Sequence, residues 1–163
     1  MADMTVRREV PRSAVSEPGI PAPALKHVFA HTDDLVVVTT TCEAYPAGIA
    51  FRLLVLSKPA MDFVHEFAFG IEQRRHAGSL DLSARATLRN GSEQAIVLGV
   101  FGGDGSTPNR GDFRFWVPLP DDAVKAQVRL TWPTMQVDET ADVDLHIFRL
   151  MLEPEPVHNQ HQP

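Results

Sequence analysis

Residues 124–132 alternate between apolar and polar side chains at every step, and no other feature of the sequence constrains the fold as strongly. The apolar members of this run are Val124, Ala126, Val128, Leu130 and Trp132. Because successive side chains in a β-strand point to opposite faces, the alternation predicts a strand with one buried and one solvated face. Pro133 has no backbone N–H to donate, so we expect the strand to end there.

A second strand is predicted just before this run. Phe113, Phe115 and Val117 fall on one face of it, and Arg114 and Trp116 fall on the other. Two prolines end the segment, and two aspartates suit a turn into residues 124–132. We therefore expect the two strands to be neighbours in one sheet.

The remaining strands are predicted from β-branched runs, from alternation and from turn residues. The predicted segments are 35–41, 49–56 (apolar on both sides, so covered on both faces), 63–71, 82–88 and 93–100. Asn90-Gly91 tolerates positive φ and predicts a hairpin between the last two. Gly102–Ser106 resembles a phosphate loop but lacks its Lys-Ser/Thr ending, so we interpret it as a mobile connection between strands.

The whole pattern predicts an all-β fold, a single antiparallel β-sandwich of about seven or eight strands. A small closed β-barrel is the alternative. Residues 143–152 fit two structures, since Val143, Leu145 and Ile147 alternate as in a strand, while Val143, Ile147, Leu150 and Met151 fit a helical stripe. We favour a strand that changes register or ends near Phe148, passing into a short turn of helix.

Length and composition predict one domain with flanking tails. The chain has 163 residues, of which 44% are hydrophobic, enough for one core but cramped for two. Residues 1–25 are proline-rich and without periodicity, and residues 153–163 are polar. We expect both to be disordered tails around a β-sandwich domain spanning residues 26–152.

Charge and targeting signals limit the partners. The chain is acidic, with a net charge of −6, which disfavours nucleic acid because phosphate binding needs clustered Lys and Arg. We find no apolar run long enough for a secretory signal or a membrane span, so we predict no membrane association and a cytoplasmic location. Cys42 is the single cysteine, which we interpret as a small buried hydrophobe rather than a catalytic thiol.

Four segments of the chain resemble a set of short uncharacterised β-domain proteins from high-GC Gram-positive bacteria. The segments are Tyr45–Phe51, Gly102–Gly105, Phe115–Pro120 and Trp132–Pro133, and the resemblance covers roughly residues 28–150. Those proteins often carry Trp-Val-Trp-Pro-Leu-Pro-Pro-Pro-Gly where this chain has Phe115–Asp122. The resemblance implies a compact bacterial β domain and brings no established activity.

Asp142, Asp144 and His146 form the one cluster of potential metal ligands on a predicted strand face. Alternate residues lie about 7 Å apart along a strand, so one ion can take Asp144 and His146 but not all three. Further ligands would come from loop acids, namely Asp104, Asp121, Asp122 or Asp138. A solvated polar face explains the triplet without a metal, so we assign no metal site, no cofactor and no catalytic residue, and keep Asp144 and His146 as candidates.

Two classes of function are left, and the sequence favours the first. In that class the chain is a non-catalytic protein-interaction or assembly module, which binds a protein partner or itself through a sheet face. Trp116 and its neighbour Arg114 are the predicted interaction residues, because the indole points away from Phe113 and Phe115 and forms either a second core layer or an exposed anchor. The alternative is a metal- or small-ligand-binding β-sandwich that uses the acidic loops with Asp144 and His146.

Overall fold

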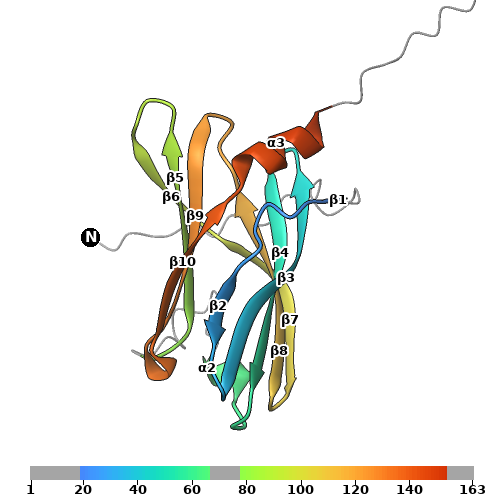
Figure 1. Cartoon of the computed structure of the whole chain (residues 1–163), viewed down its shortest axis with the longest axis vertical. Helices are drawn as coiled ribbons and strands as arrows, with labels where there is room; N and C mark the ends of the chain where they lie inside the picture. Colours follow the sequence, from blue (N-terminus) through green and yellow to red (C-terminus); the bar gives the residue numbers. More distant parts are fainter. Residues whose placement is uncertain (1–18, 67–77, 154–163) are drawn as a thin grey trace, which may run out of the picture.

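The computed structural model describes residues 19–66 and 78–153, which form two antiparallel sheets packed face to face (Figure 1). The larger sheet has six strands: β1 (Ile20–Pro21), β2 (Val28–His31), β3 (Leu35–Tyr45), β4 (Gly48–Ser57), β8 (Arg110–Pro118) and β7 (Gly99–Thr107). The smaller sheet has four: β10 (Val137–Val143), β9 (Ala123–Trp132), β5 (Asp81–Leu88) and β6 (Glu93–Ile96). The predicted all-β sandwich is confirmed. The sheets do not close into a barrel, and the described residues contain ten strands rather than seven or eight.

From Ala126 to Trp132 the alternation has the predicted consequence, whereas Val124, predicted on the buried face, is 54% exposed where the register of β9 with β5 shifts between Lys125 and Ala123. Val128, Leu130 and Trp132 of β9 are fully buried, and Pro133 ends the strand by starting a short 3-10 helix, η2 (Pro133–Met135). Burying each such side chain contributes roughly 1.5–3 kcal/mol to folding. The core between the sheets is therefore specified largely by this strand and by the inward residues of β4 and β8 that face it.

The prediction that β8 and β9 are neighbours in one sheet is wrong. β8 lies between β4 and β7 in the larger sheet, whereas β9 lies between β10 and β5 in the smaller one. The link between them crosses the top of the sandwich, with Leu119 buried and its N–H donating to the Ala47 carbonyl at 3.0 Å. Local alternation reports which side of a strand is buried but not which sheet the strand joins.

The Asn90-Gly91 hairpin is confirmed, with Gly91 at φ 82° between β5 and β6. The return strand, however, ends at Ile96, after which the chain passes to the other sheet as β7. Gly102–Ser106 is therefore part of an edge strand and not a loop. Its glycines permit close packing, since a Cβ on Gly103 would lie 2.2 Å from the Phe113 ring.

The predicted strand 63–71 is also wrong where it can be compared. Phe63–Glu66 form a single helical turn, α2, and residues 67–71 lie outside the described part of the chain. Phe63 is buried, and a carboxylate oxygen of Glu66 accepts a hydrogen bond of 3.1 Å from the Trp132 indole N–H. The helical turn therefore covers the buried indole and satisfies its donor.

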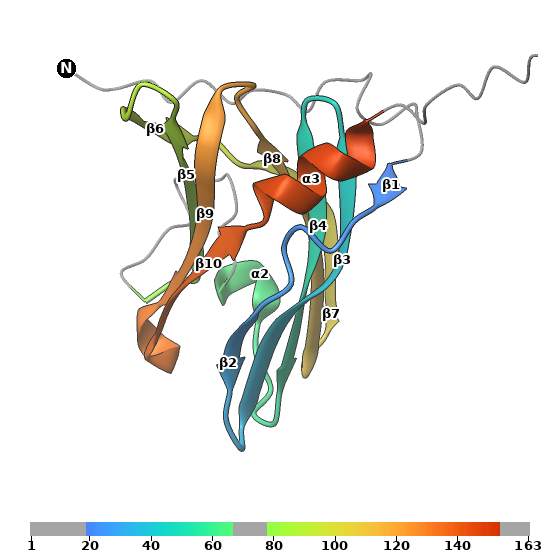
Figure 2. The ribbon, with the colours of Figure 1, turned by 45° about the horizontal axis from the view of Figure 1, so that its top comes forward.

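Residues 143–152 form mainly a helix, so the favoured strand is wrong. β10 ends at Val143, and α3 (Leu145–Leu152) follows, crossing the upper end of the sandwich (Figure 2). Asp144 is the N-cap, accepting a 2.9 Å hydrogen bond from the Ile147 N–H, which favours helix over strand. The buried positions are Leu145 and Phe148 rather than the stripe that the sequence suggested.

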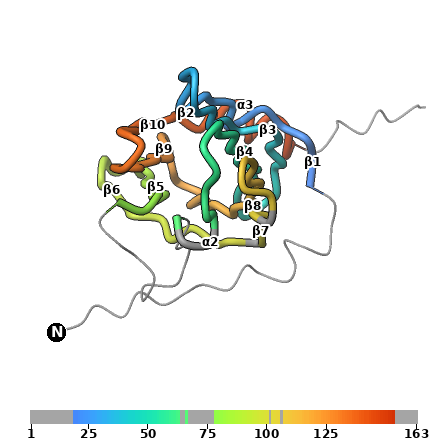
Figure 3. The backbone as a smooth tube through the Cα atoms, turned by 90° about the horizontal axis from the view of Figure 1, so that it is seen from below, coloured from blue at the N-terminus to red at the C-terminus, as the bar shows by residue number. Residues whose placement is uncertain are grey.

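The packed domain starts earlier than the predicted boundary at residue 26. β1 pairs with the end of β3, and Ala22, Ala24 and Leu25 are buried in the core. Viewed from below, β2 lies beside β10 and closes one side of the sandwich (Figure 3). Of the predicted tails at 1–25 and 153–163, residues 1–18 and 154–163 lie outside the described part of the chain.

Candidate interaction surface

The outer face of the larger sheet is the surface of β2, β3, β4 and β8 that points away from the smaller sheet. The register places Val36 beside Leu56 and Leu56 beside Arg110, and in the next row Val38 beside Leu54. From bottom to top the face changes from aliphatic to ionic to aromatic. The predicted interaction residues Trp116 and Arg114 both lie on this face.

The aromatic zone at the upper end contains Trp116, Tyr45 and Ala50, which form a small cluster separate from the main core. The Tyr45 and Trp116 rings meet edge to face, with centroids 5.6 Å apart and an interplanar angle of 72°. Trp116 points away from the Phe113 and Phe115 side chains as predicted, but it is only 3% exposed. Of the two alternatives for this residue, the structure therefore has the second core layer rather than the exposed anchor.

Arg114 lies one step below Trp116 on the same strand face and is held by Glu43. Its Nη2 lies 2.6 Å from Glu43 Oε2, and the Tyr45 hydroxyl donates to the same oxygen at 2.8 Å. Burial raises the pKa of the Tyr45 hydroxyl, and its hydrogen bond to the Glu43 carboxylate raises it further. The group therefore stays a neutral donor at physiological pH. Both predicted interaction residues are thus bound within the chain, and together they tie β3 to β8 across β4.

The ionic zone continues this pattern on β4 and β8. Arg52 Nε lies 3.1 Å from Asp112 Oδ1, and Arg110 Nη2 lies 3.8 Å from the other oxygen of the same carboxylate. All of these side chains are partly exposed, so each pair contributes at most about 1 kcal/mol to folding. Their importance is positional, since they place both signs of charge beside the aliphatic zone.

The aliphatic zone, which we name the aliphatic patch, occupies the lower part of this face. Its members are Val28, Val36, Val38, Leu54 and Leu56. Val28 is 53% exposed and Leu56 is 39% exposed, and the other three are partly exposed. Five branched aliphatic side chains on three adjacent strands form a continuous apolar surface. The prediction that residues 49–56 are covered on both faces is wrong, because this side of β4 faces solvent.

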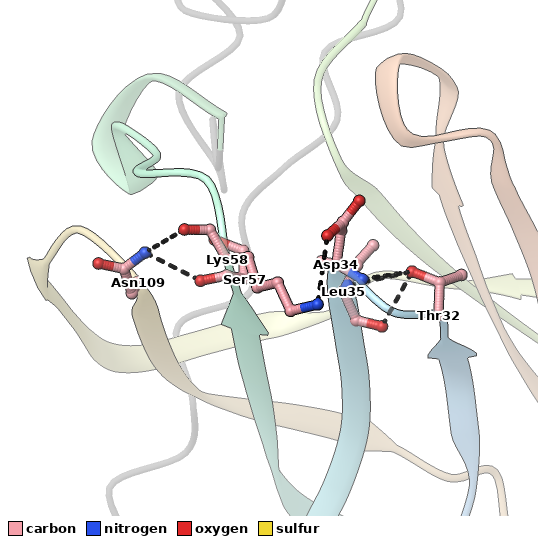
Figure 4. Close-up of polar contacts among 6 residues, drawn as sticks. All are labelled: Thr32, Asp34, Leu35, Ser57, Lys58 and Asn109. Atoms are coloured by element: carbon pink, nitrogen blue, oxygen red, sulfur yellow. Dashed lines mark hydrogen bonds and ion pairs between the residues drawn. The ribbon is translucent and has the colours of Figure 1, made fainter.

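Polar contacts fix the strand ends below the patch (Figure 4). The Asn109 side-chain amide donates to the carbonyls of Ser57 and Lys58 at 2.9 and 2.8 Å, and Lys58 Nζ lies 3.7 Å from Asp34 Oδ1. The Thr32 hydroxyl oxygen accepts from the Leu35 N–H at 3.0 Å. These bonds join the β2–β3, β4–α2 and β7–β8 loops, so the patch lies on strands whose ends are held together.

The structure separates the predicted metal ligands. Asp142 lies on β10, where its carboxylate accepts from the Gln127 amide at 2.7 Å; Asp144 caps α3; and His146 is exposed on the helix. The three residues do not share a strand face as predicted, because the strand ends before Asp144. Within residues 19–66 and 78–153, no group of three His, Cys, Asp or Glu side chains is positioned to hold a metal ion.

The loop acids do not join them. Asp138 lies on β10, and its Oδ2 is 2.6 Å from Nη2 of Arg129 on β9. The hydrogen bond from that guanidinium lowers the pKa of the Asp138 carboxyl. Asp121 and Asp122 lie exposed between β8 and β9 at the upper end of the sandwich. Cys42 is buried, as predicted, and burial raises the pKa of its thiol, which opposes the thiolate that a nucleophile requires.

Comparison of the chain with protein-family models, with curated proteins and with solved structures finds no match. Neither α2 nor α3 nor any other helix in the described ranges is long and apolar enough to cross a membrane. The interpretation of this chain therefore rests on its own geometry, and the most distinctive exposed feature of that geometry is the aliphatic patch.

The sequence alone did not predict the patch, although four of its residues lie in the predicted strands 35–41 and 49–56. A run that is apolar on both sides, such as residues 49–56, predicts a strand covered on both faces. In this two-layer sandwich the outer side of β4 has nothing above Leu54 and Leu56 in the described chain except solvent. The apolar residues on both sides of 49–56 were therefore the sequence signal for the patch. Only the number of layers packed against β4 shows that one of its apolar sides is exposed.

Proposed function

We propose that the chain is a non-catalytic assembly module that binds a second copy of itself through the aliphatic patch. The observation that carries the proposal is the exposure of Val28 and Leu56 beside three further aliphatic residues on one sheet face. Removing apolar surface from water contributes about 25 cal/mol for each Å², so covering such a face is favourable. Two sheets pack readily in this way, about 10 Å apart and with nearly aligned strands.

Charges around the patch favour a second copy as the occupant. Arg110 lies at the β8 side of the patch, and Asp33 and Asp34 lie in the loop after β2, at its opposite side. A two-fold axis parallel to the strands, between β3 and β4, places the β2 side of each copy over the β8 side of its partner. Each copy's Arg110 then approaches the partner's acidic loop, so the face is complementary to itself.

Light scattering on the purified full-length chain tests the proposal. We expect the mass to rise with concentration from 18.0 kDa toward twice that value. Leu56→Asp, which places a charge in the patch, should keep the chain monomeric. Val124→Asp is the matched control, because Val124 is a similarly exposed aliphatic residue, 54% exposed, on the smaller sheet.

The control variant should associate as the unmodified chain does. A chain that stays monomeric up to about millimolar concentration, where even weak association of roughly −4 kcal/mol would be visible, contradicts the proposal. Equal loss of association in Leu56→Asp and Val124→Asp would contradict it as well, since it would place the contact elsewhere.

A further inference from the structure

A groove of about 280 Å³ lies at the upper end of the sandwich, opposite to the aliphatic patch. It is bounded by α3, by the turn between β3 and β4, and by the link between β8 and β9. Leu119, Leu145 and Phe148 are buried beneath it, and Leu152 and Pro46 form its sides. Two segments singled out in the sequence, Tyr45–Gly48 and Pro118–Asp122, thus contribute to one groove with the helix.

Two hydrogen bonds fix α3, which forms one wall of the groove. The Asp144 N–H donates to the Ala24 carbonyl at 2.6 Å, which anchors the start of α3. The guanidinium of Arg149, from the middle of the helix, donates to the Ala123 carbonyl at the start of β9. The groove is therefore formed before any ligand binds, which lowers the cost of ordering on binding.

Two of the residues that line the groove are acidic. Asp121 and Glu153 line it with exposed carboxylates, and neither makes an ion pair with another described residue. Arg149, the one basic residue of the lining, is directed to the Ala123 carbonyl. An apolar floor lined by carboxylates that make no ion pair within the described residues is complementary to an aliphatic group carried beside a positive charge.

We propose that this groove binds a peptide segment of a partner protein in which a branched aliphatic side chain stands next to Lys or Arg. The volume of about 280 Å³ lies at the lower limit of pockets that hold small ligands, about 300–1,000 Å³, and leaves room for side chains of a peptide. The aliphatic side chain packs on Leu145 and Phe148, and the basic side chains reach Asp121 and Glu153. This site is independent of self-association, since it lies at the other end of the strands from Leu56.

Titration of the full-length, isotope-labelled chain with three capped hexapeptides tests the proposal. The probe alternates Leu and Arg; one control alternates Leu and Glu, and the other alternates Ser and Arg. We expect the Leu–Arg peptide to bind weakly, with a Kd of about 0.1 mM, and to shift the amide signals of α3. Binding of the two controls should be at least roughly tenfold weaker, because each lacks one of the two required properties.

Charge reversal supplies the second arm. Asp121→Lys with Glu153→Lys should weaken the Leu–Arg peptide about tenfold and favour the Leu–Glu peptide instead. Glu139→Lys, an exposed carboxylate on β10, is the matched control and should leave both affinities unchanged. The proposal is overturned by absence of binding, by equal binding of the Ser–Arg peptide, or by shifts that do not map to α3. Running the series on Leu56→Asp separates this result from self-association.

Discussion

The outer faces of the two sheets differ in how they meet solvent. On the smaller sheet, cross-strand pairs of opposite charge cover the surface: Arg129 with Asp138 at 2.6 Å, Arg85 with Glu93 at 3.5 Å, and Lys125 with Asp142 at 3.9 Å. On the larger sheet, charged pairs occupy only the middle, and five aliphatic side chains follow below them. One chain therefore carries a face suited to water and a face suited to burial.

The aliphatic patch is therefore specific to the larger sheet and does not follow from the amino-acid composition of the whole chain. The polar side of β9 supplies Lys125, Gln127, Arg129 and Thr131 to the smaller sheet, as strict alternation predicts. The corresponding side of β4 supplies Leu54 and Leu56. Natural sheets usually place charges on exposed faces and edges to prevent association, so their omission at one place favours association there.

Trp116→Ala tests the aromatic zone and should have the largest effect on stability. Because the indole is buried against Tyr45 and Ala50, truncation should lower the free energy of unfolding by about 3 kcal/mol in urea titrations. Tyr45→Phe is the milder comparison, since it keeps the ring and removes only the hydroxyl, which donates to Glu43 and accepts from Arg114 Nη2 at 3.4 Å, at a cost of about 1 kcal/mol. A Trp116→Ala chain with unchanged stability and lost self-association would instead restore Trp116 as a contact residue.

A charge exchange across the proposed two-fold axis should have an intermediate effect. Arg110→Asp and Asp33→Arg should each weaken self-association about tenfold, and the two together should restore it, because each copy's Arg110 faces the partner's loop. Sedimentation equilibrium of the three variants measures this. Additive weakening in the double variant would contradict the proposed axis while leaving the patch itself as the contact.

The smallest effect is expected on the smaller sheet, from Asp138→Asn. The hydrogen bond from the Arg129 guanidinium holds the pKa of the Asp138 carboxyl below its usual range. A carboxyl whose pKa is lower in the folded than in the unfolded state stabilises the fold above its unfolded pKa, and this contribution is lost as pH falls through the folded pKa. Thermal melts should thus show a slight destabilisation at pH 7 that disappears in strong acid. The Asp138→Asn variant should associate with itself as the unmodified chain does. A change in its self-association would indicate that the smaller sheet also takes part in the contact between copies.

The elements that could be predicted from the sequence are those fixed by neighbouring residues. β9 follows from period two, the β5–β6 turn from Asn90-Gly91, and the outward direction of Trp116 from its position between Phe115 and Val117. The start of α3 was missed although a cap was present at Asp144, because the alternating residues before it extended the strand pattern. An N-cap favours a helix, whereas an alternating run favours a strand. In this chain the helix forms, and it buries Leu145 and Phe148.

The candidate sites were less predictable than the fold. Trp116 and Arg114 were placed on the correct face, but the cluster that buries the indole includes Tyr45 and Ala50, 71 and 66 residues away in the sequence. Asp144 and His146 do not share a strand face, because β10 ends at Val143 and α3 follows. The aliphatic patch joins residues of three strands, and the α3 groove joins three separate segments, so neither could be read from one local pattern.

By itself, the sequence determined that this chain is an all-β domain, which residues of β8 and of most of β9 face inward, and where its tightest hairpin turns, because side-chain direction and turn conformation depend on adjacent residues. Only the tertiary structure decided that β8 and β9 lie in opposite sheets, that Trp116 is buried, and that Val28, Leu54 and Leu56 share an uncovered face. These outcomes depend on which strands pair and how many layers cover each face. Those choices are made by the free energy of the whole packed chain rather than by any segment of it.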